Sequence, residues 1–210
     1  MDRDRIIRLG SRLEYFTIGY NLFEGLVALA AGIAAESISL IGFGLDSFIE
    51  VTSASALLWR LHKDHDISAR KNLERSTLRI VGWCFIALAI YVGFESSMTL
   101  IQKQASERSL VGILIACLSL IVMQALARAK RKVAHGLESH AMRADSRQTD
   151  FCSYLSAILL GGLLLNAWLG WWWADPLAAL AMVPIIAKEG IDSLRGKACS
   201  DDCCHHFETT

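Results

Sequence analysis

The feature that most constrains this chain is the gathering of its apolar residues into long blocks. Six predominantly apolar segments of about 20 residues each follow one another along the 210 residues: 14–34, 38–60, 79–101, 109–127, 148–171 and 175–194. Such a segment is long enough to cross a bilayer as a helix. Because six helices of this length use most of the chain, we expect an all-α, six-helix polytopic membrane protein without a sizeable soluble domain.

The basic residues predict the orientation of these helices. Of the 21 Lys and Arg residues, 19 lie before the first span, in the 61–78 and 128–147 linkers with their flanks, or near the end of the sixth span. Only Lys103 and Arg108 lie on the opposite side. Cytoplasmic loops are enriched in Lys and Arg, so both termini are predicted to be cytoplasmic. The expected organisation is a cytosolic N-terminus (1–13), a transmembrane domain (14–195) and a cytosolic tail (196–210).

Two carboxylates interrupt the second apolar block. Asp46 and Glu50 are four residues apart and therefore share one face of a helix. A charge at mid-bilayer costs about 2.5–3.5 kcal/mol on insertion scales, and two carboxylates this close repel each other unless a cation or a proton lies between them. The pair predicts a cation site or a proton relay. The alternative is that neighbouring Ser, Thr or Arg side chains satisfy the acids, but no Arg or Lys lies at matching depth in another predicted span.

A second pair of donors opens the fifth block. Gln148 and Cys152 are again four residues apart, and Asp145 falls within about 60° of them on a helix, whereas Asp150 lies nearly opposite Cys152. If the two pairs face each other, they form a cage of three oxygens and one sulfur from Asp46, Glu50, Gln148 and Cys152. This donor set suits Zn²⁺ and related borderline metals. The alternative is that Cys152 serves only as a small packing residue and that Gln148 only bridges helices.

Other polar residues are candidates for accessory roles. Asn21 and Glu24 in the first span would help protons or hydrated metal to reach the site, and Asp145 lies one turn from Gln148 toward the cytoplasm. The tail holds a separate set of metal donors: Cys199, Cys203, Cys204, His205 and His206. We interpret the tail as a metal-loading or sensing arm. The alternative is an unstructured tail with free cysteines, since a reducing cytosol disfavours disulfides.

Three segments of the chain resemble the cation diffusion facilitator family. SISLIGFGLDSFIE, residues 37–50, is similar to the second span of that family, which carries a D-x-x-x-D pair. ADSRQT, residues 144–149, resembles its A-D-A-x-H-T segment, which places Gln148 at the family's His and Cys152 at its Asp. WADPLAA, residues 173–179, resembles the W-x-D-P-x-x-A start of its sixth span. The resemblance covers residues 10–195.

The resemblance implies a transporter and not an enzyme. Family members export Zn²⁺ or related divalent metals from the cytosol in exchange for protons, and commonly work as dimers. The implied transport site consists of Asp46, Glu50, Gln148 and Cys152, with the ion as substrate and no tightly bound cofactor. Because Gln148 and Cys152 depart from the family pattern, the metal stays open between Zn²⁺, the first choice, and Cd²⁺, Co²⁺, Fe²⁺ or Mn²⁺. The family's usual C-terminal cytosolic domain has no counterpart here, so a homodimer would be held by the membrane helices.

Two other classes of function stay open, a passive cation channel and a membrane-anchored metal sensor or scaffold. A membrane-embedded enzyme ranks last, because no buried nucleophile–base pair is evident. Nucleic acid binding has no support, because orientation in the membrane explains the basic stretches. The expected partners are divalent metal ions, protons and membrane lipids. The expected location is a bacterial inner membrane.

Overall fold

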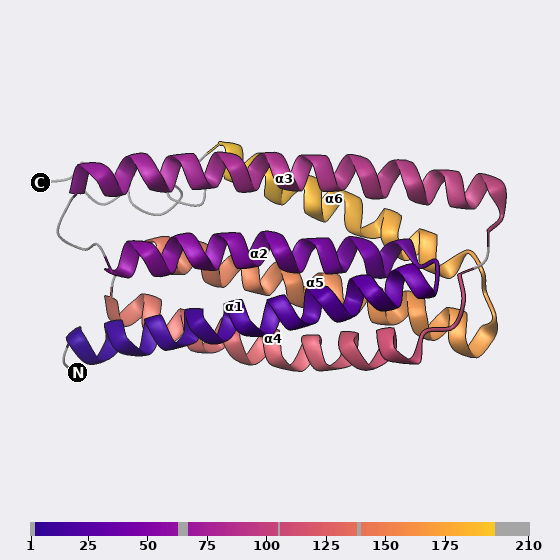
Figure 1. The fold of residues 1–210 in the computed structure, drawn as a ribbon, viewed down its shortest axis with the longest axis horizontal. Coiled ribbons are helices and arrows are strands. Elements are labelled where there is room, and N and C mark those ends of the chain that lie inside the picture. Colours follow the sequence, from indigo (N-terminus) through magenta and orange to yellow (C-terminus); the bar gives the residue numbers. More distant parts are fainter. Residues whose placement is uncertain (1–2, 63–66, 105, 138–139, 196–210) are drawn as a thin grey trace, which may run out of the picture.

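The structure is a computed structural model that describes residues 3–62, 67–104, 106–137 and 140–195. The regular structure of these residues is helical, in six elements: α1 (Arg3–Ala34), α2 (Ile38–His62), α3 (Ile67–Gln102), α4 (Leu110–Leu137), α5 (His140–Leu169) and α6 (Ala174–Leu194). Successive helices run in opposite directions, so α1 begins at the end of the bundle toward which α6 runs (Figure 1). The expected all-α, six-helix architecture is confirmed.

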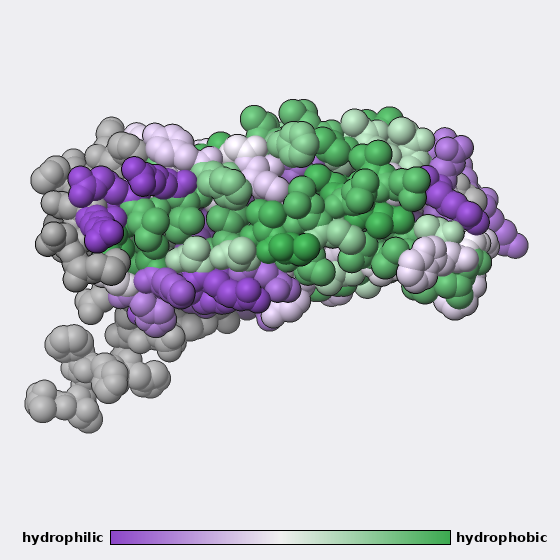
Figure 2. All heavy atoms as spheres, turned by 90° about the horizontal axis from the view of Figure 1, so that it is seen from below, coloured by the Kyte–Doolittle hydropathy of each residue, from purple (hydrophilic) through white to green (hydrophobic). Residues whose placement is uncertain are grey.

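The outer surface of the bundle is suited to lipid. Five described segments are long and apolar enough to cross a membrane: Arg5–Ala34, Ile38–Trp59, Leu78–Gln102, Leu110–Gly136 and Asp145–Leu169. Large apolar side chains such as Phe23, Trp83 and Phe94 are more than half exposed. Figure 2 shows a broad apolar band, with hydrophilic residues gathered mainly toward its ends. Since a soluble monomer rarely exposes so large an apolar patch, these features define an integral membrane protein.

The sixth helix is not among the five apolar segments. Its 21 residues include four charged side chains: Asp175, Lys188, Glu189 and Asp192. A helix of this length extends about 31 Å, which is close to the thickness of the hydrocarbon core of a bilayer. That α6 crosses the membrane therefore stays a prediction.

Helix α2 occupies the centre of the molecule. The most extensive pairings join α1 to α2, α4 to α5 and α3 to α6, and α2 also contacts α3, α5 and α6. As a result, α3 and α6 lie together along one side of the other four helices (Figure 1). Leu40 and Phe43 of α2 belong to the main apolar core together with Val92, Leu159 and Met182. Polar side chains on α2 are therefore shielded on several sides by other helices.

Glycines allow α1 to approach α2 closely. A Cβ atom added to Gly44 would lie 3.0 Å from the backbone nitrogen of Leu29, and one added to Gly25 would lie 3.1 Å from the carbonyl oxygen of Gly44. Small residues at such crossings let membrane helices pack backbone to backbone. The close approach brings the inner face of α1 against the acidic face of α2.

Four helices extend well beyond the predicted spans. Helix α1 begins at Arg3 and α3 begins at Ile67, and α4 (to Leu137) and α5 (from His140) together occupy most of the predicted 128–147 linker. The prediction of a linker there was wrong because it treated charge as a sign of a loop. Ala, Arg and Lys are good helix formers, and residues 127–132 read Ala-Arg-Ala-Lys-Arg-Lys. Lys130 consequently belongs to a helix.

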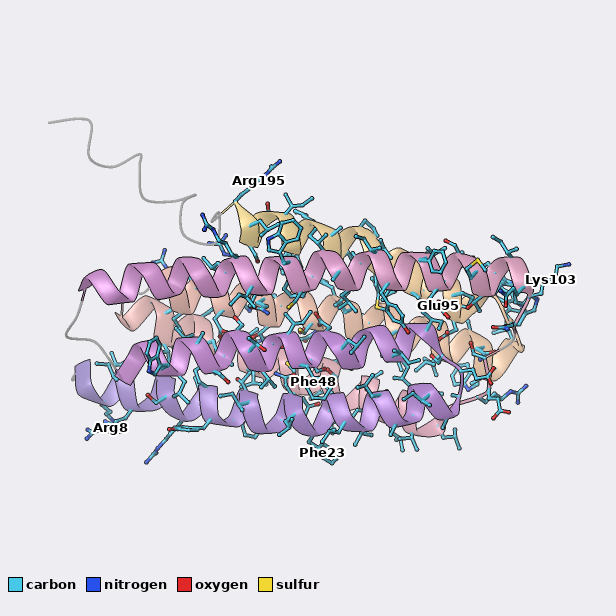
Figure 3. All side chains as sticks on the ribbon, turned by 45° about the horizontal axis from the view of Figure 1, so that its top comes forward. Arg8, Phe23, Phe48, Glu95, Lys103 and Arg195 are labelled. Carbon is cyan, nitrogen blue, oxygen red and sulfur yellow. The ribbon has the colours of Figure 1, made fainter. Side chains whose placement is uncertain are left out.

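A buried carboxylate joins the first turn of α6 to the start of α2. Asp175 is fully buried and accepts hydrogen bonds from Ser37 Oγ (2.6 Å), the Ile38 backbone N–H (3.0 Å), Ser106 Oγ (3.1 Å) and Ser39 Oγ. It thereby satisfies a backbone donor that the α2 N-terminus would otherwise leave unpaired. This contact gives the W-x-D-P segment a structural role at the end of the bundle that carries Lys103 (Figure 3).

Candidate metal centre

The two predicted donor pairs come together between α2 and α5. Asp46 and Glu50 lie one turn apart on α2 and are 2% and 1% exposed, and Cys152 of α5 is 4% exposed. The Cys152 thiol donates to Glu50 Oε2 at 2.8 Å and to Asp46 Oδ2 at 3.1 Å. Phe48, two residues from each carboxylate, marks their position midway along the bundle (Figure 3). Three of the four predicted ligands are therefore in direct contact at mid-depth.

Helix α5 adds a donor that the sequence analysis did not select. Thr149 is fully buried, and its Oγ1 donates to Glu50 Oε1 at 2.9 Å and to the Asp145 carbonyl at 3.2 Å. Thr149 lies about 60° from Cys152 around a helix, so the helical phase that pointed to Cys152 also pointed to Thr149. Gln148 is 7% exposed, and no described residue forms a hydrogen bond with its Nε2.

The donor atoms are closer together than a bound metal requires. Among the described residues, no set of three or more His, Cys, Asp and Glu side chains is already spaced to hold a metal ion. Sulfur at about 2.3 Å and oxygen at about 2.0 Å from a tetrahedral Zn²⁺ lie about 3.5 Å apart, whereas the Cys152–Glu50 contact measures 2.8 Å. Separating the thiol from the two carboxyls by about 0.4–0.7 Å would match the zinc geometry.

A buried lysine corrects one expectation. Lys130 of α4 is 0% exposed, and its Nζ lies 2.5 Å from Asp145 Oδ2 and 3.2 Å from Glu14 Oε2. We expected the basic residues of the 128–147 linker mainly to orient the helices, and for Lys130 this is wrong: it is buried in the bundle and pairs with the carboxylate of Asp145. A sequence signal existed, because Lys130 follows Met123 and Ala127 at spacings of seven and three, on the buried face of α4.

The inner face of α1 is polar over several turns. We call it the α1 stripe, and it consists of four residues that are at most 1% exposed: Glu14, Thr17, Asn21 and Glu24. Ser47 Oγ of α2 donates to Glu24 Oε2 at 3.1 Å. Four buried polar atoms of the stripe have no hydrogen-bond partner among residues 3–62, 67–104, 106–137 and 140–195: both polar side-chain atoms of Asn21, Oε1 of Glu14 and Oε1 of Glu24. The stripe brings the predicted accessory residues Asn21 and Glu24 to the interior of the bundle.

Two further acids of the predicted spans, Asp150 and Glu95, lie away from this centre. Asp150 is partly exposed and pairs with Arg131 at 2.5 Å, which agrees with its predicted place on the opposite side of α5 from Cys152. Glu95 is half-buried on α3, toward the end that carries Lys103 (Figure 3). The predicted tail donors lie outside the described residues: Cys199, Cys203, Cys204, His205 and His206.

The fold and the buried donors together define a helical membrane protein with a polar site in its interior, an arrangement typical of transporters. Residues 16–198 match the sequence model of the cation efflux transmembrane domain. Because the match covers most of the chain, this protein belongs to the cation efflux family. The family predicted from the three sequence segments is confirmed.

Two relatives show how far the similarity extends. The chain is 26% identical over 189 residues to the cation-efflux pump FieF of Shewanella oneidensis, which covers 89% of this chain and 64% of that protein. It is 25% identical over 186 residues to the magnetosome protein MamB of Magnetospira sp. strain QH-2, covering 85% and 61%. The chain thus spans about three-fifths of the length of these relatives. The bacterial relatives accord with the expected inner-membrane location.

Proposed function

We propose that this protein exports a divalent metal cation from the cytosol in exchange for protons, and that Asp46, Glu50 and Cys152 hold the ion in transit. The observation that carries the proposal is the convergence of one thiol and two carboxyls, each at most 4% exposed, between two central helices. Membership of the cation efflux family and the name of the FieF relative, a cation-efflux pump, support outward transport of a cation.

The chemistry of the donors favours a borderline metal. A thiolate with two carboxylates suits Zn²⁺ first, and Cd²⁺, Co²⁺ or Fe²⁺ next, whereas Mn²⁺ prefers oxygen donors alone. The amide oxygen of Gln148, four residues before Cys152 on α5, is our candidate for the fourth ligand. Thr149 supports the set from outside it, because its hydrogen bond fixes one oxygen of Glu50.

Metal and protons compete for the same atoms. The Cys152 thiol directs its proton toward the two carboxyls, and a metal ligand must lose its proton to bind. A divalent ion also removes the repulsion between Asp46 and Glu50. An ion that binds therefore expels protons, and protons that return expel the ion. Because the three side chains are buried, helix movement must open the site to one side at a time.

Uptake by full-length protein in liposomes tests the proposal. Zn²⁺, Cd²⁺, Co²⁺, Fe²⁺ and Mn²⁺ are offered in turn under an imposed pH gradient, and the wild type is expected to move at least one of them saturably, with protons moving the opposite way. Asp46→Ala and Cys152→Ala are expected to lower uptake by about tenfold or more. Cys117→Ala is the matched control, because Cys117 is a half-buried cysteine of α4.

Each rival function gives a different result in the same assay. Flux that neither saturates nor responds to the pH gradient identifies a passive channel. Loss of function on replacement of the tail donors, with no effect of Asp46→Ala, identifies a metal sensor or scaffold. If none of the five metals moves, the proposed function is wrong.

A further inference from the structure

We propose that Glu14 and Asp145 form a second site for divalent cations, and that the Lys130 ammonium occupies this site whenever no ion is bound there. The inference rests on the proposed transport function, which supplies the ion. Asp145 lies about two helical turns along α5 from Cys152, which belongs to the proposed transport site of Asp46, Glu50 and Cys152, here called the Cys152 centre. We call the second site the lysine-held site.

The first observation is that a cation already lies between the two carboxylates. Lys130 Nζ contacts Asp145 Oδ2 at 2.5 Å and Glu14 Oε2 at 3.2 Å, so residues from α4, α5 and α1 meet at one point. Lys130 and Glu14 are 0% exposed and Asp145 is 4% exposed. The geometry therefore shows that these two acids converge on a positive charge in the interior.

The second observation is that the ammonium leaves part of this pair unsatisfied. Glu14 Oε1 and Asp145 Oδ1 are buried, and within the part of the chain that the structure describes neither has a hydrogen-bond partner. Two carboxylates share a single positive charge, whereas on the surface Arg131 and Asp150 pair one to one. A divalent cation would match the two negative charges and use the free oxygens, and oxygen donors are the ligands that hard and borderline divalent ions accept.

The third observation is that the two places lie along the same helix. Thr149, between Asp145 and Cys152 on α5, donates from Oγ1 to Glu50 Oε1 and to the main-chain carbonyl of Asp145. Gln148, also between them, is 7% exposed, and its Nε2 has no hydrogen-bond partner among the described residues. Since Asp145 and Cys152 are seven residues apart, an ion would travel about 10 Å from one site to the next.

A lysine suits the role of a displaceable cation. Its charge is a compact ammonium on a flexible four-carbon stem, unlike the planar and rigid guanidinium of Arg. Between ions it keeps two buried acids paired, which avoids an uncompensated charge in the interior. An incoming ion must displace the ammonium, so the lysine-held site binds weakly enough to pass its ion onward. It lies toward the end of the bundle where α4 ends, which is the predicted cytosolic end.

Counting the Mn²⁺ ions bound to full-length protein in detergent, by equilibrium dialysis and metal analysis, tests this proposal. Mn²⁺ is the probe because it prefers carboxylate oxygens to thiolates. Lys130→Met removes the ammonium and keeps an unbranched side chain. Across a Mn²⁺ titration, this variant is expected to fill the site at lower free Mn²⁺ than the wild type, and so to bind one more Mn²⁺ per chain where the wild-type ammonium still holds the site. Adding Glu14→Gln or Asp145→Asn is expected to abolish the gain. Arg131→Met, which breaks the exposed pair with Asp150, is the matched control and is expected to add none.

Equal Mn²⁺ counts across the titration for the wild type and for folded Lys130→Met would overturn the proposal. If Lys130→Met does not fold, the triple variant Glu14→Gln/Lys130→Met/Asp145→Asn replaces it, because it leaves no charge to pair. The triple variant is expected to keep the metal affinity of the Cys152 centre but to take up dilute metal about tenfold more slowly, and unchanged uptake would overturn the proposal. A wild type that moves no ion refutes the transport function, whereas the Mn²⁺ count still reports on the lysine-held site.

Discussion

In the proposed function, Cys152 is the residue through which the centre selects its metal. Its sulfur is the soft donor in a set whose other atoms are oxygens, and it contacts both carboxyls of α2. Soft ligands favour Zn²⁺ and Cd²⁺ over Mn²⁺. The choice of metal in this account therefore depends on a single atom, and a substitution that exchanges only that atom is informative.

Cys152→Ser keeps a proton donor of similar size but replaces sulfur with oxygen. We expect the affinity for Zn²⁺ and Cd²⁺ to fall by about tenfold or more, and the affinity for Mn²⁺ to fall less. Competition binding across the metals measures the difference, with Cys117→Ser as the control. An equal loss for every metal would show that Cys152 acts through packing and not through its sulfur.

In the proposed site, Thr149 would act on the metal through its hydrogen bond to Glu50. Thr149→Val keeps the shape of the side chain but removes the hydrogen bond to Glu50 Oε1. Because partners of metal ligands typically contribute 10–100-fold to metal affinity, we expect a loss of about tenfold in metal affinity, measured by titration. Thr149→Ser, which keeps the hydroxyl, is expected to bind nearly as well as the wild type. If Ser binds as weakly as Val, the methyl group and not the hydroxyl is what matters.

At the scale of the helix, local spacing was enough to find part of the centre. Asp46, Glu50 and Cys152 were predictable because a four-residue spacing fixes which side chains share a face, whatever the helix packs against. The partners of Asp145 were not predictable in this way. Asp145 pairs with Lys130, which also pairs with Glu14, and these contacts depend on which helices are neighbours. In addition, the charged stretch around Lys130 looked like a loop. Contacts within a helix follow from sequence, but contacts between helices need the fold.

The crossing of α1 and α2 is an element-scale feature that a small substitution tests. Gly44→Ala places a methyl group 3.0 Å from a backbone nitrogen of α1, whereas at Gly161 an added Cβ meets nothing within 4 Å. We expect Gly44→Ala to destabilise the folded protein by about 1–3 kcal/mol, which thermal unfolding in detergent will detect as a lower Tm. Gly161→Ala is the control and is expected to change the Tm little. The reverse order of the two Tm values would contradict the described crossing.

Across the whole molecule, buried polar groups form three levels along the bundle axis. Asp175 joins α6 to the start of α2 at one end, the Cys152 centre lies at mid-depth, and Lys130 joins α1, α4 and α5 toward the other end. The Asp175 level is held by hydrogen bonds that include a backbone N–H, whereas the Lys130 level is an ion pair that another cation can replace. We infer that the first end is fixed and that the second is the one that opens to admit metal.

Asp175→Asn tests the fixed end. The amide of Asn turns one of the two acceptor oxygens into a donor, which faces either the Ser37 and Ser39 hydroxyls or the Ile38 N–H and the Ser106 hydroxyl. A buried donor therefore loses its acceptor. We expect destabilisation of about 1–3 kcal/mol, measured as a lower Tm in detergent. Asp150→Asn breaks only a partly exposed ion pair and is expected to change stability by about 0–1 kcal/mol. Equal effects of the two substitutions would remove the distinction between the two ends.

The central claim is that the transported ion is bound by one sulfur and by carboxylate oxygens at mid-depth. X-ray absorption at the zinc edge tests it most directly, on full-length protein in which Ser and Asn replace the cysteines and histidines of the tail. We predict one sulfur at about 2.3 Å and oxygen ligands at about 2.0–2.2 Å, with the sulfur lost in Cys152→Ser. A spectrum that contains only oxygen and nitrogen ligands, or one that Cys152→Ser leaves unchanged, would contradict the account.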